Sequence, residues 1–174
     1  MEKEFPKRKE IRLKNYDYSS PGAYFVTICT EQRKNYFWNG EIDLDEFKWT
    51  PVGANCVRPR NLPLSDIGKI VYEELEAWHK TYQTVKVYSF VIMPNHLHIM
   101  VGIIADEHGR PQVAPTISRM VQQFKGVVSK KVGRSIWQKG FMDHIIRDKE
   151  DYQTRAKYIY ENPKRWFYDE LYKE

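Results

Sequence analysis

The chain has 174 residues, of which 41% are hydrophobic and 29% charged, and it carries a formal net charge of +5. This length suits one domain with a single sizeable core. No apolar run is long enough to span a membrane, and the charged N-terminus does not resemble a secretion signal. Cys29 and Cys56 stand in no metal or redox spacing, so we expect a reduced, cytoplasmic protein.

The N-terminal half begins with a predicted strand over residues 23–30, which are rich in β-branched and aromatic side chains. Residues 38–64 carry scattered Gly, Pro, Asn and Asp, and their poor periodicity indicates a long excursion. Ser65 is placed to cap a helix over 66–80. The apolar stripe of this helix has a period of 3.6 and consists of Ile67, Ile70, Val71, Leu75 and Trp78.

Two further strands are predicted over 85–93 and 96–104, joined by a tight turn at Pro94-Asn95. A second helix over 116–132 follows, and Gly133 is placed to end it. Its predicted buried face consists of Ile117, Met120, Val121, Phe124 and Val128.

A short strand over 141–147 and a helix over 149–162, stopped by Pro163, complete the chain. The order β-α-β-β-α-β predicts an α+β fold, the ferredoxin-like split βαβ sandwich, with an antiparallel sheet, helices on one face and an added C-terminal helix. We expect a single domain over 15–174, preceded by a basic tail over 1–14.

The positive charge is concentrated between His108 and Met142, where no acidic residue occurs. Such a face attracts polyanions, most commonly nucleic acid, and a merely solvated helix face is the alternative. The cations of this segment are Arg110, Arg119, Lys125, Lys130, Lys131, Arg134 and Lys139.

The sharpest local feature is the pair His96 and His98 in a predicted strand. Alternate residues of a strand point to the same face, so both imidazoles project together while Leu97 and Ile99 point to the other face. Two such imidazoles suit a divalent cation. Taken alone, the pair favours two half-buried structural histidines over a metal site.

Tyr158 and Asn162 are the best candidates to complete a site, because residues four apart share one face of a helix. Asn162 would offer its amide oxygen to the metal. Tyr158 would attack a phosphate polarised by that metal, displace the 3′-oxygen and form a 5′-phosphotyrosine link. A second 3′-hydroxyl could reverse the step and rejoin strands without ATP. An ordinary packing tyrosine is the alternative.

Three segments resemble a known family: MPNHLH at 93–98, IWQKGFMDHIIRDKEDY at 136–152 and YIYENP at 158–163. They are similar to the single-tyrosine HUH transposases, in particular the REP-associated tyrosine transposases. HUH denotes two histidines around a bulky hydrophobic residue, here Leu97. The resemblance covers most of the chain in matching order. Asparagine at position 162, where many insertion-sequence relatives have glutamine, favours the REP-associated branch.

The resemblance implies Tyr158 as nucleophile, His96, His98 and Asn162 as ligands of Mg²⁺ or Mn²⁺, and single-stranded or hairpin DNA as substrate, handled at the bacterial nucleoid. Insertion-sequence relatives exchange the tyrosine helix between two subunits, whereas the REP-associated branch is expected to act as a monomer; we therefore expect a monomer, with a domain-exchanged homodimer as the alternative. The expected DNA contacts are made by Arg119, Lys125 and Lys130 to phosphates, and by Arg8, Arg12 and Lys14 in the tail to a hairpin groove.

Two other functions remain open. A non-catalytic nucleic-acid-binding module on the same scaffold would explain the charge and the aromatic residues, but it leaves the paired histidines unexplained. A replication- or mobilisation-type nicking enzyme would share the chemistry. Such enzymes usually belong to larger multidomain chains, and this chain has no room for a helicase or primase.

Overall fold

The computed structural model describes residues 20–43, 48–51, 57–104 and 116–173. In this part of the chain a single six-stranded sheet, with the order β2-β3-β4-β5-β1-β6, organises the fold. The elements in chain order are β1 (Gly22–Cys29), the 3₁₀ helix η1 (Glu31–Arg33), β2 (Lys48–Pro51), β3 (Val57–Arg60), α1 (Asp66–Thr81), β4 (Val85–Ile92), β5 (His96–Ile103), α2 (Ile117–Val132), β6 (Met142–Ile146), α3 (Lys149–Glu161) and the 3₁₀ helix η2 (Asn162–Tyr168).

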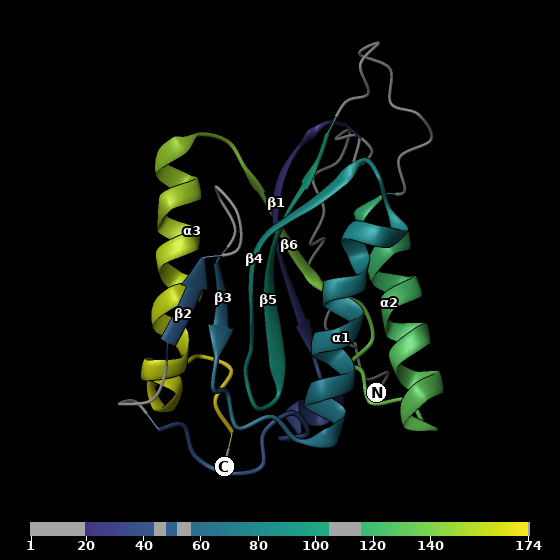
Figure 1. The fold of residues 1–174 in the computed structure, drawn as a ribbon, viewed down its shortest axis with the longest axis vertical. Coiled ribbons are helices and arrows are strands. Elements are labelled where there is room, and N and C mark those ends of the chain that lie inside the picture. Colours follow the sequence, from purple (N-terminus) through teal and green to yellow (C-terminus); the bar gives the residue numbers. More distant parts are fainter. Residues whose placement is uncertain (1–19, 44–47, 52–56, 105–115, 174) are drawn as a thin grey trace, which may run out of the picture.

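The expected ferredoxin-like core is confirmed by the four strands β4-β5-β1-β6, in which every neighbouring pair is antiparallel. Helices α1 and α2 cover one face of the sheet, and the added helix α3 covers the opposite face (Figure 1). This arrangement places α3 over the face to which β5 presents its even-numbered side chains. No helix in the described ranges is long and apolar enough to cross a membrane.

The central strand β5 is buried along its whole length, because it lies between β4 and β1 and has helices on both faces. Leu97 and Ile99 are fully buried and belong to the hydrophobic core. Burying a large aliphatic side chain contributes about 1.5–3 kcal/mol, so such a strand is a rigid support for the histidines between them.

The start of α1 and the end of α2 are capped by the residues that the sequence predicts. The Ser65 side chain accepts a hydrogen bond from the Gly68 amide over 3.0 Å and caps α1, an interaction worth about 1 kcal/mol. Gly133 ends α2 with a φ of 81°, in the left-handed region that glycine tolerates. The five apolar residues predicted to be the buried face of α2 are all buried.

One feature was not predicted from the sequence. The excursion at 38–64 contains an antiparallel hairpin, β2-β3, and β3 pairs with β4 in parallel at the edge of the sheet. The α-helix before Pro163 ends as predicted: α3 stops at Glu161, and the 3₁₀ helix η2 begins at Asn162. Pro163 is accepted in η2 because the first turn of a helix needs no amide donors.

Candidate metal and nucleophile site

The two histidines of β5 lie side by side on the sheet face that α3 covers. Their Nε2 atoms are 3.0 Å apart, and both side chains are almost completely buried. The turn Pro94-Asn95 begins the strand, and the strand's alternation then directs both imidazoles to the same face, as the sequence predicts.

Each imidazole has a hydrogen-bond partner on its other nitrogen. The Nδ1 of His96 lies 2.8 Å from the side-chain oxygen of Asn95, which can only accept, so His96 donates there and its Nε2 carries the lone pair. The Nδ1 of His98 lies 2.8 Å from the hydroxyl of Thr27, which is able to donate or accept. Such partners orient metal-binding histidines and select their tautomer.

Burial keeps both imidazoles uncharged. It lowers the pKa of His96 to about 3, with a further contribution from the positive charge of Arg33. Burial also lowers the pKa of His98 well below its ordinary value, and neighbouring His96 adds to the effect. Neutral imidazoles with their Nε2 atoms adjacent are suitable ligands for a divalent cation.

Tyr158 projects from α3 toward the histidines. Its ring lies 5.1 Å from that of His98, measured between centroids, and 6.0 Å from that of Phe25. Tyr158 itself is only partly covered by these contacts, and 41% of it is exposed. Burial of its hydroxyl region and the charge of Asp169 raise the pKa of Tyr158 to about 12, so the phenol is neutral at physiological pH.

Asp169, which directly follows η2, is the acidic residue that lies close to the histidine pair. Its carboxylate oxygen Oδ2 lies 4.0 Å from Nε2 of His96 and accepts hydrogen bonds from the Tyr158 hydroxyl over 3.3 Å and from Nδ2 of Asn162 over 2.8 Å. Its other oxygen accepts from the Leu171 amide over 2.6 Å. His96, His98 and Asp169 each offer one ligand atom, and these atoms all lie within 4.8 Å of one another.

Asn162, the third ligand expected from the sequence, is buried beside this cluster and directs its amide nitrogen toward Asp169. Its amide oxygen is buried and makes no hydrogen bond within the described part of the chain. A side-chain amide exchanges oxygen and nitrogen by rotation about one bond, so Asn162 as ligand stays a prediction. In the geometry as it stands, the carboxylate of Asp169 is the available third ligand.

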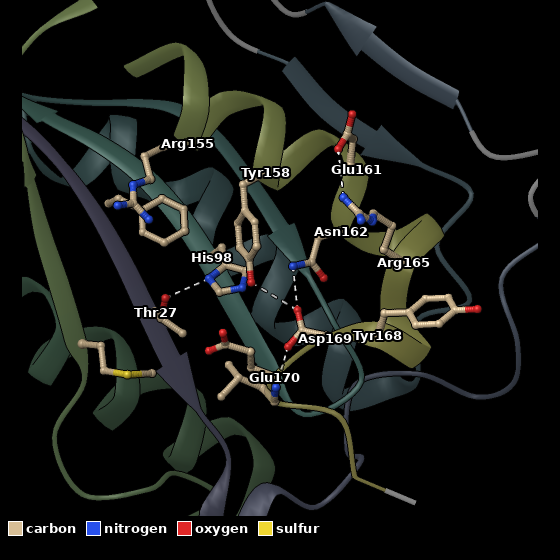
Figure 2. A pocket seen from close by; sticks show the side chains of 13 residues that line it. Thr27, His98, Arg155, Tyr158, Glu161, Asn162, Arg165, Tyr168, Asp169 and Glu170 are labelled. Carbon is tan, nitrogen blue, oxygen red and sulfur yellow. Dashed lines mark hydrogen bonds and ion pairs between the residues drawn. The ribbon is translucent and has the colours of Figure 1, made fainter. Parts of the chain in front are cut away.

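A cavity of about 520 Å³ opens in front of these groups, and Tyr158 and His98 form part of its wall (Figure 2). Two arginines stand at it: Arg155, whose guanidinium lies 5.4 Å from the Phe25 ring, and Arg165, which pairs with Glu161 over 3.5 Å. A cavity with a tyrosine, a histidine pair and two guanidinium groups is suited to a phosphate ester.

The three cations predicted to contact DNA that the structure describes do not line this cavity. Arg119, Lys125 and Lys130 belong to α2, on the other face of the sheet (Figure 1). Arg119 and Lys130 are exposed, whereas the ammonium group of Lys125 donates to the backbone oxygens of Gln138 and Gly140. Burial lowers the pKa of Lys125 to about 8. The tail residues Arg8, Arg12 and Lys14, with the whole of segment 1–14, lie outside the described residues.

Four residues of the site were not predicted from the sequence: Thr27, Arg155, Arg165 and Asp169. Only Thr27 carried a usable signal, because alternation in two adjacent antiparallel strands brings a β1 hydroxyl opposite one histidine. Asp169 was missed because it lies beyond the last predicted helix, where no periodic pattern relates it to the histidines. His144 pairs with Asp151 over 2.7 Å.

The fold and the site together define a class of protein. Two histidines around one hydrophobic residue on the central strand of a ferredoxin-like sheet, with a single tyrosine facing them from a helix, are the arrangement of a single-tyrosine HUH domain. No protein-family model matches the chain.

Two proteins of Haemophilus influenzae are similar over nearly the full length. An "Uncharacterized protein" is 31% identical over 184 residues, covering 95% of this chain and 93% of that protein. A "Putative REP-associated tyrosine transposase" is 24% identical over 172 residues, covering 93% of this chain and 82% of that protein. The chain is therefore similar over nearly its full length to a protein described as a REP-associated tyrosine transposase.

A solved structure supports the fold. The structure of a REP-associated tyrosine transposase bound to a REP hairpin superposes with a TM-score of 0.58 at 17% identity, covering 91% of this chain and 76% of that one.

Proposed function

We propose that this protein cleaves and rejoins single-stranded DNA through a covalent link to Tyr158, with a divalent cation held beside it. The observation that carries the proposal is the contact between Tyr158 and His98: a half-open tyrosine lies 5.1 Å, ring to ring, from one of two neutral histidines at the wall of an arginine-flanked cavity.

The donor set fits a divalent cation. His96 and His98 supply two neutral nitrogens and Asp169 one carboxylate oxygen, and Asn162 donates a hydrogen bond to that carboxylate. A mixed set of imidazole and carboxylate ligands suits Mn²⁺. It suits Mg²⁺ less well, because Mg²⁺ prefers oxygen ligands more strongly. A cation bound here would withdraw charge from a non-bridging oxygen of the scissile phosphate.

The residues of the chain would then carry out an exchange of phosphate esters. The hydroxyl of Tyr158 is oriented by Asp169, and its oxygen attacks phosphorus in line with the departing 3′-oxygen. The bond from tyrosine to phosphorus forms as the bond to the 3′-oxygen breaks; the phenol releases one proton and the departing oxygen takes up one. Attack of another 3′-hydroxyl on the phosphotyrosine reverses these steps and joins two strands.

Hairpin DNA is the proposed substrate, because the structural neighbour is described as bound to a REP hairpin. Arg155 and Arg165 stand at the cavity and would bind the phosphates next to the cleaved bond. Arg119 and Lys130 on α2 would bind more distant phosphates, whereas Lys125 is already engaged with backbone oxygens. The proposed contacts of Arg8, Arg12 and Lys14 to a hairpin groove rest on charge alone.

The alternative is a non-catalytic DNA-binding module. It is favoured by one observation, the hydrogen bond from Tyr158 to Asp169, because a hydroxyl that is held by a carboxylate and has a raised pKa is a poor nucleophile until the carboxylate is otherwise engaged. A nicking enzyme of the replication or mobilisation type would use the same residues and differ in its DNA substrate.

Cleavage of labelled hairpin DNA from the gene's own flanks tests the proposal. We expect the wild type to cut one strand in Mn²⁺ or Mg²⁺ and to form a denaturation-resistant adduct with the fragment downstream of the cut, whose 5′-phosphate is linked to Tyr158. Tyr158→Phe should bind equally well and form no adduct, while Tyr160→Phe, on another side of α3, should behave as wild type. Binding without cleavage in both proteins, at a verified binding site, would favour the non-catalytic module.

We also propose that each chain builds its own site, because the tyrosine and both histidines already meet within one chain. Mixing Tyr158→Phe with His96→Ala tests this. A site within one chain predicts no recovery of cleavage, whereas exchange of the tyrosine helix between two subunits predicts recovery.

A further inference from the structure

A second cavity, of about 480 Å³, lies next to the site and has no part in the chemistry proposed above. Trp166 of η2 connects this cavity with the histidine pair: its ring is 5.9 Å from that of His96, and it forms part of the wall of this cavity. The volume falls within the range of about 300–1,000 Å³ that is typical of small-molecule sites. The cavity is therefore large enough for a nucleobase.

Aromatic side chains form its walls. Trp166 and Phe167 both pack against Tyr172, with centroid distances of 5.1 and 5.7 Å. Trp38 donates its Nε1 hydrogen to the Ile92 carbonyl oxygen over 2.8 Å, so the polar edge of the indole is satisfied. Phe167 remains 64% exposed although it is wholly apolar. This side chain is available to stack against a planar ligand.

Charged groups complete the lining. Lys164 and Lys173 supply two ammonium groups, of which that of Lys173 also donates to the Gln32 carbonyl oxygen over 3.1 Å, and Glu41 supplies one carboxylate. A ligand that matches all three features is planar, carries N–H donors on its edge and is attached to an anion. A base of single-stranded DNA meets this description, since its ring stacks, its amino or imino groups donate to a carboxylate, and its phosphates face the ammonium groups.

Residues of the same short helix, η2, line both cavities. Arg165 and Tyr168 of η2 line the cavity beside Tyr158, whereas Lys164 and Phe167 line the second one. A DNA strand that leaves the first cavity along η2 therefore passes directly over the second. We propose that the second cavity holds one unpaired base of the DNA strand whose phosphate is presented to Tyr158, stacked on Phe167 and hydrogen-bonded to Glu41.

This inference rests on the proposed function only for the identity of the ligand as single-stranded DNA. Binding measured in EDTA, where no cleavage is expected, tests the base-binding cavity separately from the proposed strand transfer. The probe is a labelled single strand from the gene's own flanks, in which a single abasic site is moved along the sequence. We expect one position, near the cleaved bond, at which loss of the base weakens wild-type binding by about 5- to 150-fold, the range that corresponds to one stacked base.

Phe167→Ala should weaken binding of the intact strand by a similar factor and should be insensitive to the abasic site at that position. Glu41→Gln, a surface change with little risk to folding, should alter which base is preferred there. Tyr160→Ala is the matched control, because Tyr160 is 47% exposed on α3 and lines neither cavity. Circular dichroism of each variant confirms that it is folded.

Two results would overturn the proposal. One is an abasic profile that is the same in Phe167→Ala, Glu41→Gln and the wild type. The other is a change in sedimentation of Phe167→Ala without DNA at unaltered DNA affinity, which would identify the cavity as a contact between copies of the chain. If the base effect is found but no tyrosine adduct ever forms, the cavity stands and the strand-transfer proposal fails.

Discussion

Asn162 donates its amide nitrogen to Oδ2 of Asp169 over 2.8 Å, and the same oxygen accepts from Tyr158. The asparagine and the tyrosine share one face of the last helical segment, and both converge on a carboxylate that follows it. The carboxylate is nearly buried, with 3% of its side chain exposed, and its Oδ2 is 4.0 Å from Nε2 of His96. Asp169 therefore lies between the last helical segment and the histidine strand and is close to both.

The first prediction separates Asp169 from Asn162 as the third metal ligand. Asp169→Asn removes the charge that a cation would neutralise, so we expect Mn²⁺ affinity, measured by isothermal titration calorimetry, to fall more than it does in Asn162→Ala. Loss of a residue that only orients a ligand typically costs about 10- to 100-fold in affinity. The reverse ranking would assign the metal to the amide oxygen of Asn162.

The second prediction concerns Thr27. Thr27→Val keeps the shape of the side chain but removes the partner of Nδ1 in His98. We expect Mn²⁺ affinity to fall by about 10- to 100-fold, because the imidazole loses the hydrogen bond that orients it. Electron paramagnetic resonance of bound Mn²⁺ measures this without cleavage. Thr154→Val, at an exposed position of α3, is the control and should bind as wild type does.

The third prediction compares two helical glycines. A Cβ at Gly68 would collide with the carbonyl oxygen of Phe37, whereas a Cβ at Gly126 would meet nothing within 4 Å. We expect Gly68→Ala to lower the free energy of unfolding by about 1–3 kcal/mol through strain. Gly126→Ala should raise it by about 0.5–1 kcal/mol, because alanine loses less backbone entropy in a helix. Urea denaturation of both variants checks the signs, and equal shifts would contradict the packing around Gly68.

The fourth prediction is a pH dependence of stability that originates at Lys125. Burial holds the pKa of its ammonium group at about 8 in the folded protein, below its ordinary 10.5. Between these pH values the unfolded chain binds more protons, so this lysine makes the free energy of unfolding rise as the pH increases from about 8 to 10.5.

The rise should be smaller in Lys125→Met than in the wild type, whereas the exposed control Lys139→Met should leave it unchanged. Thermal unfolding at a series of pH values measures the difference between the variants. Identical slopes in wild type and Lys125→Met would place the source of the pH dependence elsewhere in the chain.

Local patterns were sufficient to predict most of the fold. The 3.6-residue period of α2, its Gly133 end and the alternation around His96 each depend on neighbours a few residues away. The hairpin β2-β3 was missed because its two strands of four residues each are too short to show a period and one lies at the edge of the sheet.

The sequence by itself determined which side chains face together within one element: His96 with His98, and Tyr158 with Asn162. Only the tertiary structure decided that Asp169 lies between these two pairs and that α2, with Arg119 and Lys130, lies on the opposite face of the sheet. The physical reason is that periodicity specifies the buried side of a helix or strand but not its partner. The position of Asp169 depends on how η2 packs through Trp166 against His96, a contact between segments far apart in the chain.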